Sequence, residues 1–159
     1  MDRDEASHLI QYDAWACARM QSTLESAKPL PEPALKTWGH VVASLECWLE
    51  RVEGRNVPPG AWWSTATLAE WGKRRAAAHA RWAVYAEGLD ARELAREVRF
   101  TNSSGQPCHD PVEAIVRHVV NHGTHHRAQV ATSLRAAGLV PPAMDYIVWR
   151  RELQQAAAR

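Results

Sequence analysis

The sequence predicts an all-α protein, a four-helix bundle with a longer connection between its third and fourth helices and a short C-terminal helix. Three observations predict this fold. Four segments repeat apolar residues with a helical period, proline or glycine clusters separate them, and one turn-rich stretch precedes the last segment. The chain of 159 residues has the length of one ordinary domain, so we expect a single domain over residues 1–159.

The first two helices are expected over residues 4–26 and 34–53. A helix cannot continue between them, because three prolines interrupt this stretch: Pro29, Pro31 and Pro33. Gly54 ends the second helix, and residues 55–60, which contain two prolines and a glycine, are expected to form a loop.

The third helix is expected to end at residue 88 and to begin at one of three capping residues, Ser64, Thr65 or Thr67. Residues 97–106 are short and turn-rich, which is consistent with an extended crossover or a small hairpin. The fourth helix is expected over residues 110–138, with Asp110-Pro111 as its cap, and a short helix over residues 146–157 follows two prolines.

Charge and composition argue against several classes of partner. The formal net charge is +1, from 19 Lys+Arg and 18 Asp+Glu spread along the chain, so no basic block is offered to nucleic acid or anionic lipid. No apolar stretch approaches the length of a membrane span, and the N-terminus begins with acidic residues. We therefore expect a cytoplasmic protein that binds neither nucleic acid nor membranes. Three widely spaced cysteines are expected to be reduced thiols: Cys17, Cys47 and Cys108.

The segment "NHGTHHRAQV", residues 121–130, places three histidines within five positions of the fourth helix. On a helical wheel His126 lies inside the apolar stripe, about 30° from its centre, and His122 lies at its edge, about 70° away. The two form an i, i+4 pair on one inward face, a separation that lets two imidazoles converge on one ion. His118 and His125 lie further round the helix. The stripe consists of Val112, Ile115, Val116, Val119, Val130, Leu134 and Ala137.

A metal site needs a third ligand, and four other histidines are candidates: His8, His40, His79 and His109. His40 lies at the rim between the apolar and acidic faces of the second helix, about 100° from the apolar centre, so periodicity permits it without requiring it. His79 lies in an Ala- and Arg-rich segment and is expected to be exposed. His109 precedes a helix start, where a capping or surface role is expected, and His8 could lie near a bundle end. The residues alone leave the third ligand open.

Four segments carry more specific patterns: "YDAWACARM", "WGHVVASLECWLERVEG", "VVNHGTHHRAQV" and "PPAMDYIVW". The first resembles Y-x-x-W-A-N-x-R, the second a histidine followed by W-L-x-R, and the third N-H-x-x-H-H-R-G-Q. Together they resemble the DinB/YfiT family of metal-binding four-helix bundles over nearly the whole chain. Cys17 stands where the family usually has Asn, and Ala128 where it usually has Gly. The resemblance implies that His40, His122 and His126 are the metal ligands, with His125 as a neighbour.

Three imidazoles without a thiolate suit Zn(II), Ni(II), Fe(II) or Mn(II), and we expect one such divalent ion per chain. Three protein ligands leave a coordination position open, which is typical of a catalytic ion. Two chemistries fit this site: metal-hydroxide hydrolysis of a small ester or amide, and transfer of a low-molecular-weight thiol to a small electrophile. The resemblance favours the thiol-dependent S-transferase, because characterised relatives use bacillithiol or mycothiol. A non-catalytic metal-binding bundle of the stress response is a third alternative.

Several other side chains have two interpretations. Cys47 lies two turns beyond the second-helix histidine and could line the site, although a buried core thiol is the favoured interpretation. Gln129 and Asp145 could orient imidazole N–H groups or substrate, or could have solvated or capping roles. Trp62 and Trp63 could cover the bundle end or form a pocket lid.

The expected partners are a small-molecule substrate and a second copy of the chain. The apolar sector of the second helix is wide, and an amphipathic helix that is buried on more than one side needs more than its own bundle to cover it. The resemblance also implies a dimer, which is the family's usual assembly. We therefore expect a homodimer.

Overall fold

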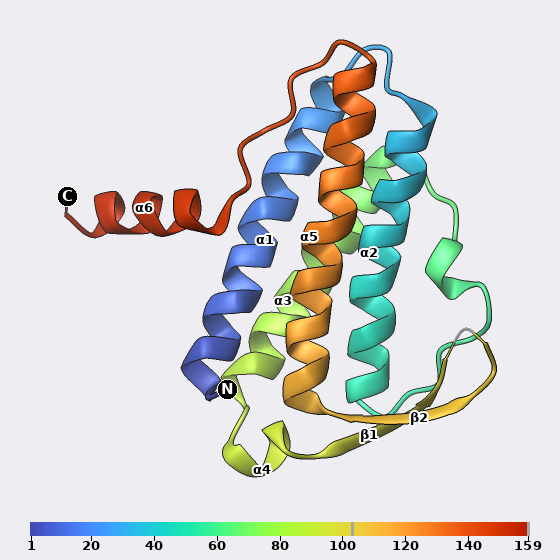
Figure 1. Cartoon of the computed structure of the whole chain (residues 1–159), viewed down its shortest axis with the longest axis vertical. Helices are drawn as coiled ribbons and strands as arrows, with labels where there is room; N and C mark the ends of the chain where they lie inside the picture. Colours follow the sequence, from blue (N-terminus) through green and yellow to red (C-terminus); the bar gives the residue numbers. More distant parts are fainter. Residues whose placement is uncertain (103, 159) are drawn as a thin grey trace.

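The computed structural model describes residues 1–102 and 104–158, and its long helices pack side by side (Figure 1). These helices are α1 (Arg3–Ser26), α2 (Glu32–Val52), α3 (Leu68–Glu87) and α5 (Val112–Ala136). Helix α5 packs most extensively against α2, and α3 packs against both α1 and α2. The predicted four-helix bundle is confirmed.

The helices begin where capping groups satisfy their first backbone N–H groups. Asp2 accepts a hydrogen bond from the backbone N–H of Glu5 and caps α1. Thr67, one of the three predicted caps, forms a reciprocal capping box with Glu70 at the start of α3. Local side-chain chemistry therefore defines both of these helix ends.

The connection between α3 and α5 contains a hairpin, one of the two predicted alternatives. A short helix, α4 (Ala91–Leu94), leads into strand β1 (Glu97–Thr101), which pairs antiparallel with β2 (Pro107–Pro111). The predicted cap at Asp110-Pro111 is confirmed at Pro111, which is the N-cap of α5, although both residues also belong to β2. Helix α5 therefore begins at Val112.

Two features close one side of the bundle. The hairpin crosses the end of the bundle beside α2 and α5, and the loop after α2 carries a 3-10 helix, η1 (Ala61–Trp63), which packs on α2 (Figure 1). Neither η1 nor α4 was predicted, since segments of three or four residues are too short to show a period.

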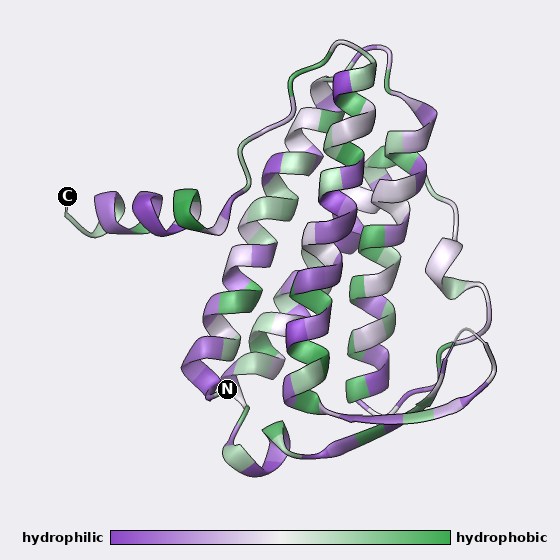
Figure 2. Cartoon of the chain, in the orientation of Figure 1, coloured by the Kyte–Doolittle hydropathy of each residue, from purple (hydrophilic) through white to green (hydrophobic). Residues whose placement is uncertain are grey.

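Helix α6 (Tyr146–Ala157) projects away from the bundle, as Figure 1 shows. Trp149 is buried against α1, and Arg19 of α1 forms an ion pair with Glu152 at 2.7 Å. On the same helix the side chains of Ile147 and Leu153 are 55% and 40% exposed. Figure 2 shows that α6 carries hydrophobic and hydrophilic residues in alternation. Part of its apolar surface is thus uncovered by the bundle.

A buried charged network joins three helices in the centre of the bundle. Arg127 of α5 donates to Asp13 of α1, and it also lies 3.2 Å from the sulfur of Cys17. His79 of α3 donates to Asp13 at 3.0 Å. Burial alone would raise the pKa of Asp13, but Arg127 and His79 lower it to about 2, so the carboxylate is ionised at neutral pH. The network is therefore a set of opposite charges that compensate one another.

The prediction that His79 is exposed was wrong. Its side chain is 6% exposed, and its two ring nitrogens contact Asp13 and the carbonyl oxygen of Arg75. Burial lowers the pKa of His79, but hydrogen bonds with Asp13 and Cys17 raise it to about 9. The Ala- and Arg-rich composition of this segment does not indicate that His79 is buried, because its partner, Asp13, lies on a different helix.

The buried face of α5 is wider than the predicted stripe and is displaced round the helix. Four residues outside that stripe are also buried: Val120, Gly123, Arg127 and Ala131. Ala137, placed in the stripe, is exposed. Because the wheel counts an arginine as polar, it places the centre of the face too close to His126, which is only partly buried. His122 lies at the edge of the buried face, as predicted.

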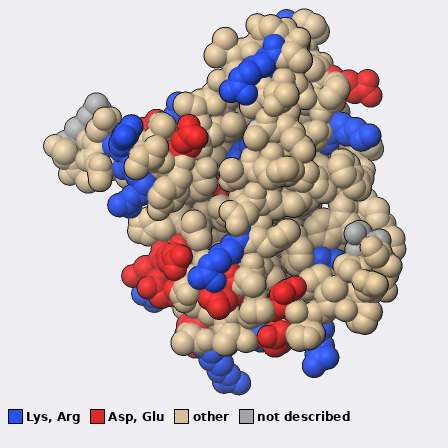
Figure 3. All heavy atoms as spheres, viewed as in Figure 1, with Lys and Arg blue, Asp and Glu red and all other residues tan. Residues whose placement is uncertain are grey.

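Figure 3 shows acidic and basic side chains close together over the lower half of the face that α1 and α5 present. This view has no extended surface of a single charge sign. Within the described residues, no helix has both the length and the apolarity that crossing a membrane requires.

Gly123 lies where the charged network meets α5. A Cβ atom at this position would lie 2.7 Å from Oδ1 of Asp13 and 2.8 Å from Nη1 of Arg127. We therefore predict that Gly123→Ala lowers the free energy of unfolding by about 2 kcal/mol, because the buried pair must shift. Urea denaturation followed by circular dichroism measures this change.

Gly88→Ala is the matched control. Gly88 has φ −85° and its added Cβ would approach nothing closer than 3.6 Å. We expect its free energy of unfolding to change by less than about 1 kcal/mol. Equal destabilisation by the two substitutions would contradict the prediction.

Candidate metal centre

Three histidines converge between α2 and α5. Helix α2 supplies His40, and α5 supplies His122 and His126 as an i, i+4 pair. One ring nitrogen of each lies within 4.8 Å of the corresponding nitrogens of the other two. The ring centroids of His122 and His126 are 4.3 Å apart, and that of His40 lies 4.6 Å from His126. The structure thus brings together the three residues that the family resemblance implies as ligands.

This arrangement fits a divalent ion after a small movement of side chains. A tetrahedral ion with metal–nitrogen distances of about 2.1 Å holds its imidazole nitrogens about 3.4 Å apart. In this site the ligand nitrogens lie within 4.8 Å of one another. A modest rotation of the imidazole rings would bring them to the spacing that the ion requires. The donor set is three imidazoles, which suits borderline transition metals.

Two of the rings are held by hydrogen bonds at Nδ1. His40 donates from Nδ1 to the carbonyl oxygen of Trp62 at 2.9 Å, and His126 donates from Nδ1 to the side-chain oxygen of Gln129 at 2.8 Å. A proton at Nδ1 leaves the lone pair on Nε2 for an ion. Gln129 is therefore hydrogen-bonded to His126 where it can orient the imidazole, which is one of the two roles that the sequence left open for it.

The electrostatics of the cluster keep two of its imidazoles, those of His40 and His122, neutral. Burial, followed by the neighbouring charges of His126 and His40, lowers the pKa of His122 to about 3. Burial also lowers the pKa of His40, although its hydrogen bond to Trp62 raises it in part. Since only a neutral imidazole binds a metal, His40 and His122 offer lone pairs at neutral pH.

The three-histidine cluster adjoins a pocket of about 700 Å³. Its wall includes His40 and His122 together with aromatic side chains from α2, η1 and β1: Trp48, Trp62, Trp63 and Phe100. Trp63 stacks on His40 with the ring centroids 4.0 Å apart and the planes 9° from parallel. Trp62 and Trp63 both line this pocket, which supports their interpretation as a pocket lid rather than as a cover for the bundle end.

A fourth histidine borders the site and was not assigned a role from the sequence. The ring of His118 lies 5.4 Å from that of His122 and 4.9 Å from that of Trp48, and it lines the same pocket. Burial lowers its pKa. A signal for it was present, because His118, His122 and His126 follow one another at intervals of four residues.

The other histidines lie outside the cluster. His125 is exposed and accepts a hydrogen bond from Gln129 at 3.2 Å. His8 is exposed and contacts the carbonyl oxygen of Asp4, and His109 on β2 is exposed. None of these three belongs to the group of converging ligand atoms.

Cys47 and Asp145 also have other surroundings. Cys47 is buried, and burial raises the pKa of its thiol to about 11. This burial supports its interpretation as a core thiol, and the groove that it borders, with Glu46 and Arg74, is separate from the pocket beside the histidines. Asp145 is exposed at the start of α6.

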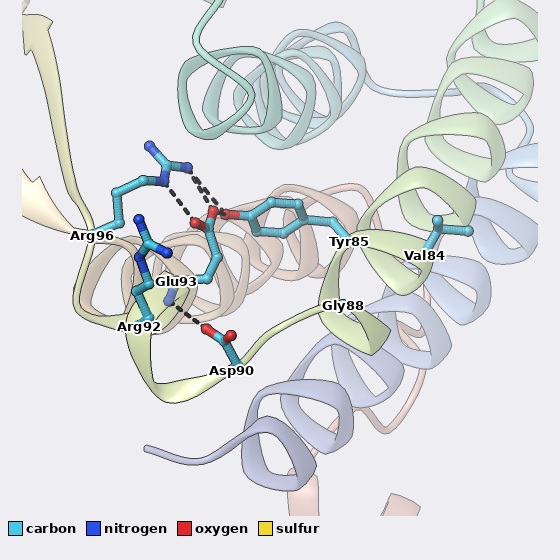
Figure 4. Close-up of a pocket in the computed structure, with 7 residues that line it drawn as sticks. All are labelled: Val84, Tyr85, Gly88, Asp90, Arg92, Glu93 and Arg96. Carbon is cyan, nitrogen blue, oxygen red and sulfur yellow. Dashed lines mark hydrogen bonds and ion pairs between the residues drawn. The ribbon is translucent and has the colours of Figure 1, made fainter.

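A second depression of about 700 Å³ lies beside the C-terminal end of α3 (Figure 4). There Tyr85 donates to Glu93 at 2.6 Å, and Arg96 pairs with Glu93 at 2.8 Å. Arg96 also donates to the carbonyl oxygen of Val52 on α2. These polar groups bond to one another and hold α4 against the bundle. We therefore interpret the depression as a structural feature, separate from the histidine cluster.

The fold and the site together define a class of protein, a four-helix bundle in which two helices bring three imidazoles to one point. The chain belongs to the DinB family, whose model matches residues 4–156. A crystal structure of a DinB-like protein from Bacillus cereus has the same fold, with a TM-score of 0.62 and 17% identity, over 85% of this chain and 94% of that chain. No curated protein matches the chain. The family assignment made from the four sequence segments is confirmed.

We predict that His126→Ala weakens the retention of a divalent metal at least about 100-fold, because it removes one of three ligands. Elemental analysis after purification without chelator measures the metal content per chain. His125→Ala is the matched control, since His125 is adjacent, exposed and outside the cluster. Equal losses from the two variants would mean that the ligand register on α5 is wrong.

Proposed function

We propose that this chain is a divalent-metal-dependent enzyme that transfers a low-molecular-weight thiol to a small electrophile, with His40, His122 and His126 holding the ion. One observation carries the proposal. The three-imidazole cluster opens on a large pocket whose described lining includes neither cysteine nor serine. Thr101 is the described lining residue with an aliphatic hydroxyl, and in our proposal the nucleophile is instead the thiol of a second substrate. A bound divalent ion supplies Lewis-acid chemistry that lowers the pKa of a thiol.

The residues of the chain contribute positioning and exclusion of water. The carbonyl oxygen of Trp62 and the amide oxygen of Gln129 orient two of the three imidazoles. Trp63 covers one face of His40, and the aromatic wall reduces the access of water to the cluster. Low local water content strengthens the electrostatic interactions on which activation of a thiol depends.

Hydrolysis of a small ester or amide is a second candidate, and the placement of His118 favours it. This imidazole lines the pocket beside His122, where it could accept a proton from a water molecule as general base. The two candidates differ in a simple requirement. The transferase needs an added thiol, whereas the hydrolase does not.

We predict that the cobalt-substituted protein develops a thiolate-to-metal charge-transfer band in the near ultraviolet when a suitable low-molecular-weight thiol is added. Titration of the cobalt-substituted protein with several thiols, monitored by absorbance, measures the band independently of turnover. His122→Ala should abolish it, and the control His125→Ala should retain it. Turnover of an ester or amide without thiol, lost in His122→Ala, would instead support hydrolysis.

We also propose that the chain forms a homodimer, and α6 provides a more direct argument than α2. The wide apolar sector of α2 is largely buried within the chain, against α3, α5 and η1. Helix α6 instead projects from the bundle and exposes apolar side chains, among them Ile147 and Leu153. Exposed apolar surface of this kind is typical of a contact with another subunit.

Light scattering at micromolar concentration is predicted to give twice the mass of the chain. Leu153→Glu should shift the mass toward that of one chain, because it places a charge on the exposed apolar surface of α6. Val84→Glu is the matched control, since Val84 is 70% exposed on α3. A single-chain mass for the unaltered protein would rule out the dimer.

A further inference from the structure

Arg51 occupies an unusual position in the wall of the pocket. Its guanidinium carbon lies 4.6 Å from the ring centroids of both Trp48 and Trp62, and 4.4 Å from that of Phe100. Nη2 donates to the carbonyl oxygen of Thr101 at 2.7 Å. Within the described residues, the guanidinium is thus held among three aromatic rings by this hydrogen bond, which uses one of its five N–H donors.

Arg51 lacks a carboxylate partner among the described residues. Arg55 and Arg81, by contrast, both form ion pairs with Glu50 and Glu53. Burial lowers the pKa of Arg51, with a partial opposing effect from Cys47 and Cys108. The described lining of the pocket also includes no aspartate or glutamate. This pocket therefore carries a fixed positive charge that no acidic side chain of its described wall balances.

Aromatic rings form a continuous wall from Arg51 to the histidine cluster. The guanidinium lies 4.6 Å from the ring of Trp48, which lies 4.9 Å from that of His118, which in turn lies 5.4 Å from that of His122. A ligand that spans this wall would have an apolar or flat body on the rings. Its charged end would lie at Arg51 and its other end at the histidines.

We propose that the pocket binds a small organic acid with an extended apolar body, and that Arg51 is the specificity-determining residue that receives its carboxylate. A guanidinium presents paired N–H donors that match the two oxygens of a carboxylate. The low-dielectric aromatic surroundings strengthen this pairing. The proposal deepens the proposed function, since it names the class of molecule that reaches the histidines. The binding of the carboxylate itself requires no ion.

Calorimetric titration of the full metal-free chain at low salt tests the proposal with two probes of similar shape, 4-phenylbutyrate and the neutral 4-phenylbutyramide. The unaltered chain should bind the acid at least about tenfold more tightly than the amide. Arg51→Gln should abolish this preference. Arg51→Lys should retain part of it, because a lysine keeps the charge without the paired donors. Arg135→Gln, an exposed arginine near the end of α5, is the control and should leave it unchanged.

Equal affinity for the two probes, or no binding of either, would overturn the proposal. Preservation of the preference in Arg51→Gln would also overturn it, because the acid would then be recognised elsewhere. Circular dichroism verifies that each variant folds. If Arg51→Gln does not fold, the preference of Arg51→Lys for the acid over the amide is compared with that of the unaltered chain instead. Since these titrations contain no metal, they succeed or fail independently of the cobalt spectrum that tests thiol transfer.

Discussion

The buried ion pair between Arg127 and Asp13 determines which face of α5 turns toward the interior of the bundle. An unpaired guanidinium in this position would cost several kcal/mol, so α5 cannot rotate without losing that compensation. His126 directly precedes Arg127, and His122 lies one turn earlier on the same helix. Their direction toward α2, and therefore toward His40, follows from a charge pair that lies outside the candidate metal centre.

Much of this arrangement could be predicted from the sequence because it depends on local patterns. Helical periodicity and the proline and glycine breaks locate the four long helices, and the i, i+4 spacing identifies His122 and His126 as neighbours. His40 is different, since its position at the rim of α2 is compatible with burial or exposure. The family resemblance was needed to associate it with the other two.

The rest depends on contacts between distant parts of the chain. Arg127 and His79 are polar residues that are buried because each pairs with Asp13 on another helix, so residue type and local composition do not indicate their burial. The carbonyl oxygen of Trp62 orients His40 through a backbone contact that no side-chain pattern encodes. Arg51 has an ordinary position on an amphipathic helix, and its significance appears only when the loop and the hairpin bring Trp62 and Phe100 to it.

The three converging imidazoles come from two helices that are far apart along the chain, with α3 and the hairpin between them. An ion bound by both α2 and α5 would therefore close a long loop of the chain. As a crosslink, it would reduce the conformational entropy that the chain gains when the two helices separate. Metal supply would then govern the lifetime of the protein as well as its chemistry. A metal-depleted chain would separate these helices more often and expose them to proteases sooner.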